Sequence, residues 1–131
     1  MAVSIQVDPE SGIAIATCTG VLGRDDAREG VAALWAEPAW TGQSAIWDFR
    51  AAKFDLSSSD IRELALFVLG HQPEKPPPRV AFVTARDVDY GLARAFEAFR
   101  QDPRTDFRVF RDYDEALRWA WGGLERQRGA P

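Results

Sequence analysis

Three consecutive serines are the residues best placed to do chemistry in this 131-residue sequence. Ser57, Ser58 and Ser59 follow Asp55 and precede Asp60, where a helix is predicted to begin. A phosphate here would add a charge of about −1.5 to −2 at the end of the helix where its dipole favours negative charge, and the free N–H groups could hold a bound anion instead. We therefore predict a phosphoacceptor or an anion-binding site at one of the three serines. Helix capping by Ser57 and Asp60 is the structural alternative.

The other residue types leave few places for catalysis. His71 is the only histidine and Cys18 the only cysteine, so the sequence provides neither a zinc site built on these residue types nor an intramolecular disulfide. It also lacks the glycine-rich phosphate loops and the Gly-x-Ser-x-Gly nucleophile motif. We predict an exposed His71, a buried and unreactive Cys18, and no metal or cofactor.

Asp48 is an acid in an apolar setting, because aromatic residues flank it within a predicted strand. A buried carboxylate is costly unless it is hydrogen-bonded. We predict a structural hydrogen bond to Asp48 from Arg50 or Lys53. An enzyme that uses Asp48, Arg50 or His71 is the alternative, although no arranged base and nucleophile are visible.

Apolar periodicity predicts the strands and helices that must position these residues. A short turn at 9–12 makes the first two strands an antiparallel hairpin, and the later alternation of strands and helices implies right-handed crossovers between parallel strands. We predict a single α/β domain, residues 1–126, and a frayed tail, residues 127–131. Its mixed, mostly parallel five-stranded sheet is flanked by four helices in the order ββαβαβαβα. The predicted strands are 3–7, 13–18, 45–50, 79–84 and 107–111, and the helices are 24–36, 57–70, 88–100 (capped by Asp87) and one that begins at Asp112.

Some apolar residues exceed what a helix must bury. Leu66 and Phe67 lie outside the inward face of helix 57–70, so they pack under the proline-rich loop 72–78 or form a patch for a partner, a second copy or a lipid chain. Phe67, Phe96 and Phe99 could line a ligand pocket. The alternative is that the aromatic residues fill the core, with Phe96 and Phe99 inward.

The composition argues against some classes of binding partner and some locations for the protein. The net charge is −4, which argues against non-specific binding to nucleic acid or to anionic membranes. No stretch approaches the roughly 18 apolar residues of a membrane span, and the first residues do not read as a signal peptide. A cytoplasmic location is the simplest expectation.

Several short segments resemble a known family. Ile46-Trp-Asp-Phe-Arg50 and Phe54-Asp-Leu-Ser-Ser-Ser59, together with segments 79–84, 90–94 and 109–119, resemble the STAS domain of anti-sigma-factor antagonists. More narrowly, the chain is similar to the uncharacterised bacterial SpoIIAA-like group, which has been linked to the lipid-binding Sec14/CRAL-TRIO-type fold. The resemblance covers nearly the whole chain and includes no catalytic signature.

The resemblance implies a non-catalytic regulatory module. We expect a protein partner, or a second copy in a homodimer, to contact the loop–helix region Asp55–Phe67, through Asp55, Asp60, Leu66 and Phe67. In phosphorylated members an Asp-Ser-Ser-Gly motif opens the helix, and the resemblance places Ser57 or Ser58 nearest that phosphoacceptor. Here Leu56 is an extra residue and Asp60 stands near the expected glycine, where its charge opposes a phosphate. The alternative function is a carrier of a small apolar, lipid-like ligand.

Overall fold

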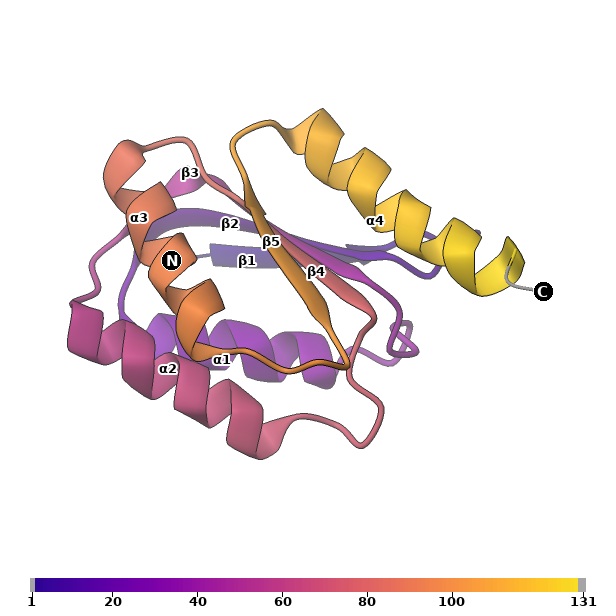
Figure 1. Cartoon of the computed structure of the whole chain (residues 1–131). Coiled ribbons are helices and arrows are strands. Elements are labelled where there is room, and N and C mark those ends of the chain that lie inside the picture. The colour runs from indigo at the N-terminus through magenta and orange to yellow at the C-terminus, as the bar shows by residue number, and fades with distance from the viewer. Residues whose placement is uncertain (1, 130–131) are drawn as a thin grey trace.

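The computed structural model describes residues 2–129 and the side chains of residues 2–122. It contains the predicted five strands and four helices in the predicted order (Figure 1). Their bounds are β1 Ala2–Val7, β2 Ala14–Leu22, α1 Arg24–Trp35, β3 Ala45–Phe54, α2 Ser58–His71, β4 Arg79–Val83, α3 Asp87–Phe99, β5 Asp106–Phe110 and α4 Tyr113–Gly129.

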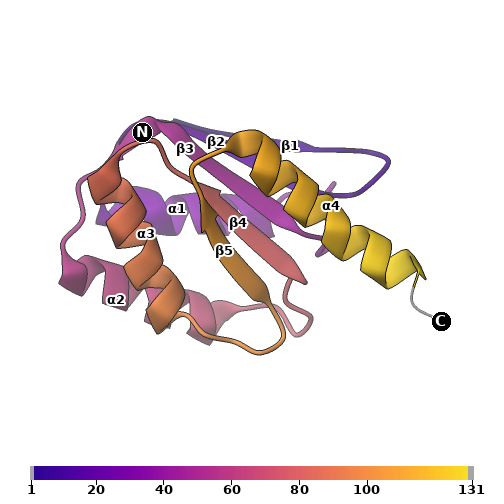
Figure 2. The same ribbon diagram turned by 45° about the horizontal axis from the view of Figure 1, so that its top comes forward.

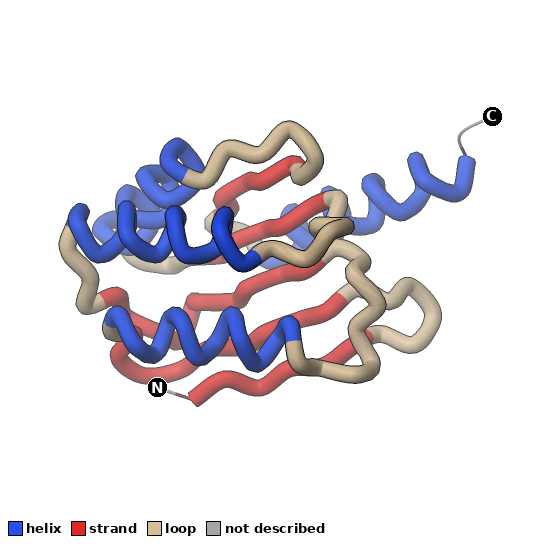
Figure 3. Tube along the Cα trace, turned by 90° about the horizontal axis from the view of Figure 1, so that it is seen from below, coloured by secondary structure: helices blue, strands red, loops and turns tan. Residues whose placement is uncertain are grey.

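The five strands form one sheet in the order β1-β2-β3-β4-β5. The β1–β2 pair is antiparallel and the other three pairs are parallel, as predicted. Because each right-handed crossover moves one strand further in the same direction, α1, α2 and α3 all lie on one face of the sheet. The last helix, α4, lies on the opposite face (Figure 2), and Figure 3 shows the three-helix layer in front of the strands.

The central strands β2 and β3 extend four residues beyond their predicted ends, past the end of β4. Their register shifts between Thr17 and Thr19, so that two residues of β3, Phe49 and Arg50, stand opposite the single Cys18. A bulge of this kind moves every later side chain to the other face. The predicted end of the strand at Arg50 coincides with this bulge, and the strand continues beyond it to Phe54.

The core has two parts, one on each face of the sheet. The larger part lies between the sheet and α1–α3, and the smaller lies between the sheet and α4. In β3, Trp47 faces the first part and Ile46 the second, and both side chains are buried. The strand β3 is therefore central and covered on both faces.

The inward face of α3 differs from the prediction at its end. Its buried positions are Asp89, Ala93 and Phe96, and Arg100 follows at the C-cap, only 4% exposed. The predicted inward residue Phe99 is instead 46% exposed. A charged residue thus occupies the last inward position, which residue type alone assigned to the neighbouring aromatic ring.

The structure differs from the prediction at the start of α3 and at the end of α4. The N-cap of α3 is Arg86, without a side-chain hydrogen bond, and Asp87 is the first helical residue rather than the cap. Asp112 does cap α4, since its Oδ1 accepts from the N–H groups of Asp114 (2.8 Å) and Glu115 (3.4 Å). Helix α4 continues to Gly129, and residues 130–131 lie outside the described part of the chain.

Candidate functional site

A cavity of about 80 Å³ lies within the larger part of the core, between the sheet and helices α1–α3. Three of its lining residues are polar or charged: Asp26, Gln72 and Arg100. The rest are apolar side chains and Gly30. Among them are Cys18, Trp47, Phe49, Leu64, Phe82 and Phe96. Because protein interiors are otherwise close-packed, an apolar space with a few polar groups in its wall is a default candidate for a binding site.

Arg100 is the unusual member of the cavity wall. Its Nη2 donates to Gln72 Oε1 (2.9 Å), and its Cζ lies 5.5 Å from the ring centre of Phe107. Its Nη1 is buried and has no hydrogen-bond partner within the described residues. The nearby carboxylate of Asp102 pairs instead with Arg104 (2.9 Å) and accepts from Gln72 Nε2 (2.9 Å). Burial lowers the pKa of Arg100, and the charge of Asp102 offsets this only in part.

The other buried charges of the described region have ionic partners. Asp89, 1% exposed, accepts from the N–H of Phe54 (3.2 Å) and lies 3.7 Å from Arg86 Nε. Arg79 donates to the carbonyl of Trp119 and pairs with Asp106. Asp89 Oδ2 has no hydrogen bond but keeps an ionic partner in Arg86, whereas Arg100 lines the cavity with Nη1 unpaired and with no ion pair of its own in the described residues.

Cys18 carries the one thiol in the cavity wall. Its thiol is 1% exposed, and burial together with the charge of Asp48 raises its pKa to about 12. The thiol is therefore protonated at neutral pH and a poor nucleophile. This confirms the buried Cys18 that the sequence predicted.

The three phenylalanines predicted to share a pocket are not brought together. Phe96 lines the cavity, but Phe67 and Phe99 do not. Phe67 packs between Trp35 of α1 (ring centres 6.3 Å apart) and His71 (4.4 Å), with Arg28 above its ring. Sequence reasoning missed Arg100 because a pattern of apolar residues does not report a charged residue on the inward face.

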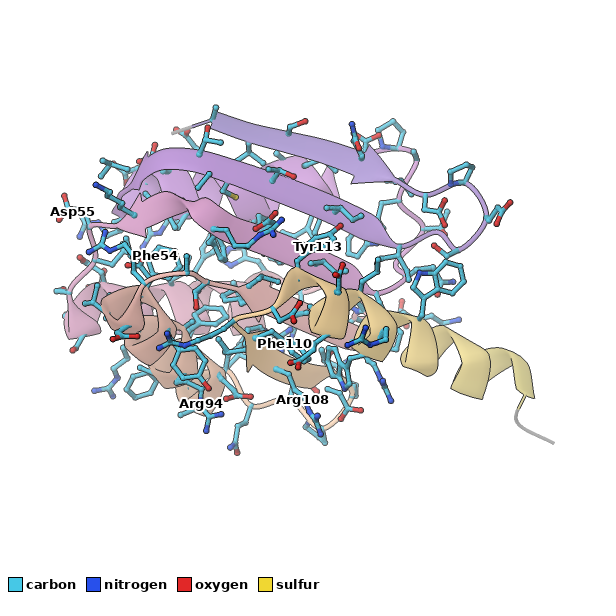
Figure 4. All side chains as sticks on the ribbon, turned by 90° about the horizontal axis from the view of Figure 1, so that it is seen from above. Phe54, Asp55, Arg94, Arg108, Phe110 and Tyr113 are labelled. Carbon is cyan, nitrogen blue, oxygen red and sulfur yellow. The ribbon has the colours of Figure 1, made fainter. Side chains whose placement is uncertain are left out.

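The serine-rich junction after β3 has the predicted capping geometry. Ser57 Oγ accepts from the N–H of Asp60 (3.1 Å), and Asp60 Oδ2 accepts from the N–H of Ser57 (3.0 Å). Hydrogen bonds from Ser57 lower the pKa of Asp60 despite some desolvation. Ser58, Ser59 and Asp55 are exposed, and Asp55 stands at the edge of the molecule where β3 ends (Figure 4). Ser57 is therefore engaged in the cap although it is exposed, whereas Ser58 and Ser59 are exposed residues of the first turn outside the capping pair.

Leu66 and Phe67 differ from each other in their surroundings. Leu66 is 58% exposed, so it belongs to the outer surface of α2. Phe67 is half-buried against α1 rather than packed under the proline-rich loop. His71 is exposed as predicted, and its Nδ1 lies 2.8 Å from the carbonyl of Phe67.

A cluster of polar groups occupies the opposite face of the sheet, beside the start of α4. Asp48 is 7% exposed and accepts from Arg50 Nε (2.9 Å), Nη2 (2.8 Å) and backbone N (3.1 Å). The guanidinium of Arg50 lies 4.7 Å from the ring centre of Tyr113, whose position Figure 4 shows. Burial would raise the pKa of Asp48, but the hydrogen bonds and charge of Arg50 outweigh it and lower that pKa. This is the predicted structural hydrogen bond.

Neither a metal cluster nor a membrane helix is found in the described residues. No group of three or more His, Cys, Asp and Glu residues lies close enough there to hold a metal ion. Likewise, among residues 2–129, no helix combines the length and the apolar character that crossing a membrane requires.

Comparison with known proteins gives a match in structure alone. A scan against protein-family models finds no match, and neither does a search of curated proteins. Among solved structures, the chain is similar to an uncharacterised protein of the DUF3478 family with a SpoIIAA-like fold, from Shewanella loihica PV-4. The sequences are 21% identical over 91% of this chain and 92% of the other, with a TM-score of 0.56. The chain has a SpoIIAA-like fold.

The SpoIIAA-like fold confirms the resemblance read from the sequence segments. At 21% identity the likeness concerns the fold, and a fold hosts many functions. The function must therefore be argued from the cavity, the serine-rich junction and the buried charges of this chain.

Proposed function

We propose that the chain is a non-catalytic binding module that takes up a small, mainly apolar ligand in the cavity between the sheet and α1–α3. The observation that carries this proposal is the cavity itself, about 80 Å³ of space lined almost entirely by apolar side chains. An engineered cavity of roughly 150 Å³ admits benzene, so the space here suits a group of a few carbon atoms. A longer chain would require α1 or α2 to move.

The cavity contains no arrangement suited to catalysis. Its one thiol, Cys18, is held protonated, and His71, the only histidine, lies outside the lining. Asp26, the acid in the wall, accepts a hydrogen bond from the N–H of Gly23 (2.9 Å). A site with an unreactive nucleophile and an acid engaged with the backbone is better suited to binding than to bond cleavage.

Gly30 keeps part of the cavity open. It lies buried in the middle of α1, where a Cβ atom would sit 3.5 Å from Trp47 and 3.7 Å from Val3, both ordinary contact distances. Glycine inside a helix costs roughly 0.5–1 kcal/mol relative to alanine. A residue that lowers helix stability while leaving a cavity open is consistent with a binding site.

The substitution Gly30→Ala therefore tests the proposal. We expect it to raise the free energy of unfolding by about 1 kcal/mol, since it removes the helix penalty and fills space. We also expect it to reduce the amount of small apolar compound that co-purifies with the protein from its host. Denaturant unfolding and mass spectrometry of organic extracts measure the two effects.

Gly91→Ala is the matched control. Gly91 lies inside α3, is exposed, and has nothing within 4 Å of its added Cβ. It should gain similar stability from helix propensity and leave the bound compound unchanged. If neither the wild-type protein nor the control carries a compound that the Gly30→Ala protein lacks, the proposal is wrong.

A second candidate function, binding of a protein partner through Asp55–Phe67, is favoured by the outer face of α2. Leu66 is 58% exposed there, and Ser58 and Ser59 face solvent at the start of the same helix. The inner face of α2 contributes Ile61, Leu64 and Val68 to the cavity wall. A ligand that shifts α2 would thereby change the outer face, so one helix could link ligand and partner.

A further inference from the structure

We infer that the ligand of this cavity is a small carboxylate with an apolar body, whose charged end binds Nη1 of Arg100. This inference rests on the proposed function and names the class of compound that the site takes. It comes from one observation that an apolar cavity alone does not explain. A guanidinium 96% removed from solvent lines the cavity with an N–H group that has no partner in the described structure.

The position of Arg100 follows from α3. The inward residues Asp89, Ala93 and Phe96 are spaced by four and three, and four more residues lead to Arg100 at the C-cap. Its Nη2 is held by Gln72 and its plane lies near the ring of Phe107, so the side chain has a defined orientation. A guanidinium oriented by one hydrogen bond and one ring presents its remaining N–H groups as a fork for a carboxylate.

The charge of Arg100 has no direct ion pair in the described residues and is only partly compensated by Asp102. The nearest acid of the network, Asp102, is engaged by Arg104 through two hydrogen bonds from its side chain and one from its backbone. Hydrogen bonds connect Asp102 to Arg100 only through Gln72, which donates to Asp102 and accepts from Arg100. A buried cation without a directly paired counter-ion is costly, and a bound anion would reduce that cost. An uncharged ligand would leave it in place.

A second pocket offers a route from solvent to Arg100. It is an outer groove of about 620 Å³, whose lining includes Arg94, Asp102 and Thr105. Arg100 and Phe107 belong to the walls of both the groove and the inner cavity. They therefore separate solvent from the cavity, and rotation of the Arg100 side chain would open a way in. The carboxylate would lie at this boundary with its apolar body directed inward.

The cavity volume limits the apolar body. About 80 Å³ is roughly half of the space that holds benzene in an engineered core. The fitting compounds are short linear or branched chains, and long fatty acids are excluded unless the helices separate. We therefore expect the cavity to select ligands that carry a carboxylate and to bind only chains below a maximum length.

Matched acids and alcohols test the inference. The probes are the straight-chain carboxylates from butanoate to octanoate and the primary alcohols with the same number of carbons, added separately to the uniformly ¹⁵N-labelled full-length protein near pH 7. Amide and arginine side-chain signals in ¹H–¹⁵N spectra report binding. We expect the best acid to bind about tenfold or more tightly than its alcohol, because a hydrogen bond to a charged group strengthens binding by that order.

Arg100→Met removes the charge and keeps a long apolar side chain. It should abolish the preference for the acid and leave the alcohol bound as before, so alcohol binding also shows that the variant is folded. Arg100→Lys should retain part of the preference. Arg118→Met, which removes an exposed positive charge from α4 on the opposite face of the sheet, should leave the preference unchanged.

The possible outcomes separate the two proposals. Equal binding of acid and alcohol that Arg100→Met does not alter overturns the role of Arg100 and leaves the apolar ligand site standing. An acid preference lost equally in Arg118→Met assigns it to general surface charge and overturns the role of Arg100. If no acid and no alcohol of the series binds, both the site and its anchor are wrong.

Discussion

Two arginines on opposite faces of the same sheet stand next to buried polar groups, and their surroundings differ. On the α4 face, Arg50 makes a two-pronged contact with Asp48 (2.9 and 2.8 Å) while its own side chain remains 48% exposed. On the face covered by α1–α3, Arg100 is itself buried and meets a neutral amide, Gln72, instead of a carboxylate.

The charge of Arg50 stabilises the fold, whereas the charge of Arg100 is left available to a ligand. In the Asp48–Arg50 pair, the buried carboxylate of Asp48 accepts hydrogen bonds from Arg50. The side chain of Arg50 keeps access to water. At Arg100 the buried member has an unpaired N–H group, and the adjoining space is a cavity rather than packed side chains. Satisfied buried polar groups are usual in native proteins. Of the four buried side-chain atoms without a hydrogen bond in the described residues, Arg100 Nη1 is the one whose residue lines the cavity, and this asks for an explanation.

The same substitution at the two arginines should have unequal effects, and this is the largest difference that we expect. Arg50→Met leaves Asp48 buried without its ion pair and should lower the free energy of unfolding by about 2 kcal/mol. Arg100→Met removes an unneutralised buried charge and should change stability by less than about 1 kcal/mol, in either direction. Urea unfolding at neutral pH measures both values.

A double variant controls this result. Adding Asp48→Asn to Arg50→Met removes the stranded negative charge, so part of the lost stability should return. An Arg100→Met protein that is destabilised as much as Arg50→Met would break the comparison, because Arg100 would then be a structural residue like Arg50.

The pH dependence should separate the two arginines further. Although burial favours the neutral acid, Arg50 lowers the pKa of Asp48 below its ordinary value of 3.8. A lowered native pKa contributes stability that is present at neutral pH and is lost as the pH falls through that pKa. The stability difference between the wild-type protein and Arg50→Met should therefore shrink as the pH is lowered from about 7 to about 3.

Arg100→Met should show no such trend, since a guanidinium stays protonated across this range. Unfolding of both variants at several pH values provides the measurement. A constant difference for Arg50→Met would mean that the stability does not come from the ionised Asp48.

Much of the fold was predictable because its signals are local. The hairpin follows from the turn before Ile13, the strand–helix alternation from apolar periodicity, and the start of α2 from the spacing of Ser57 and Asp60. The extension of β3 was not, because the bulge at Phe49 and Arg50 depends on pairing with β2. A register shift between strands leaves no regular pattern in either strand alone.

The site was less predictable than the fold. The Asp48–Arg50 contact could be predicted because the partners are two residues apart in one strand. The cavity could not, since it depends on how three helices pack over the sheet and on the missing side chain of Gly30. Arg100 and Gln72 are 28 residues apart, and charged residues near a helix end read as solvent-exposed.

The smallest effects that we expect concern the serines. The hydroxyl of Ser57 is engaged in the helix cap, whereas those of Ser58 and Ser59 are available. Ser57→Ala removes the acceptor for the N–H of Asp60 and should lower the free energy of unfolding by about 1 kcal/mol. Ser58→Ala affects an exposed first-turn residue and should stay within about 0.5 kcal/mol of the wild-type protein. Denaturant unfolding measures both, and phosphopeptide mapping of the protein from its host extends the test to modification. Phosphate on Ser58 or Ser59 would agree with their availability. Phosphate on Ser57 would contradict the distinction, because that hydroxyl would have to leave its cap before accepting the group.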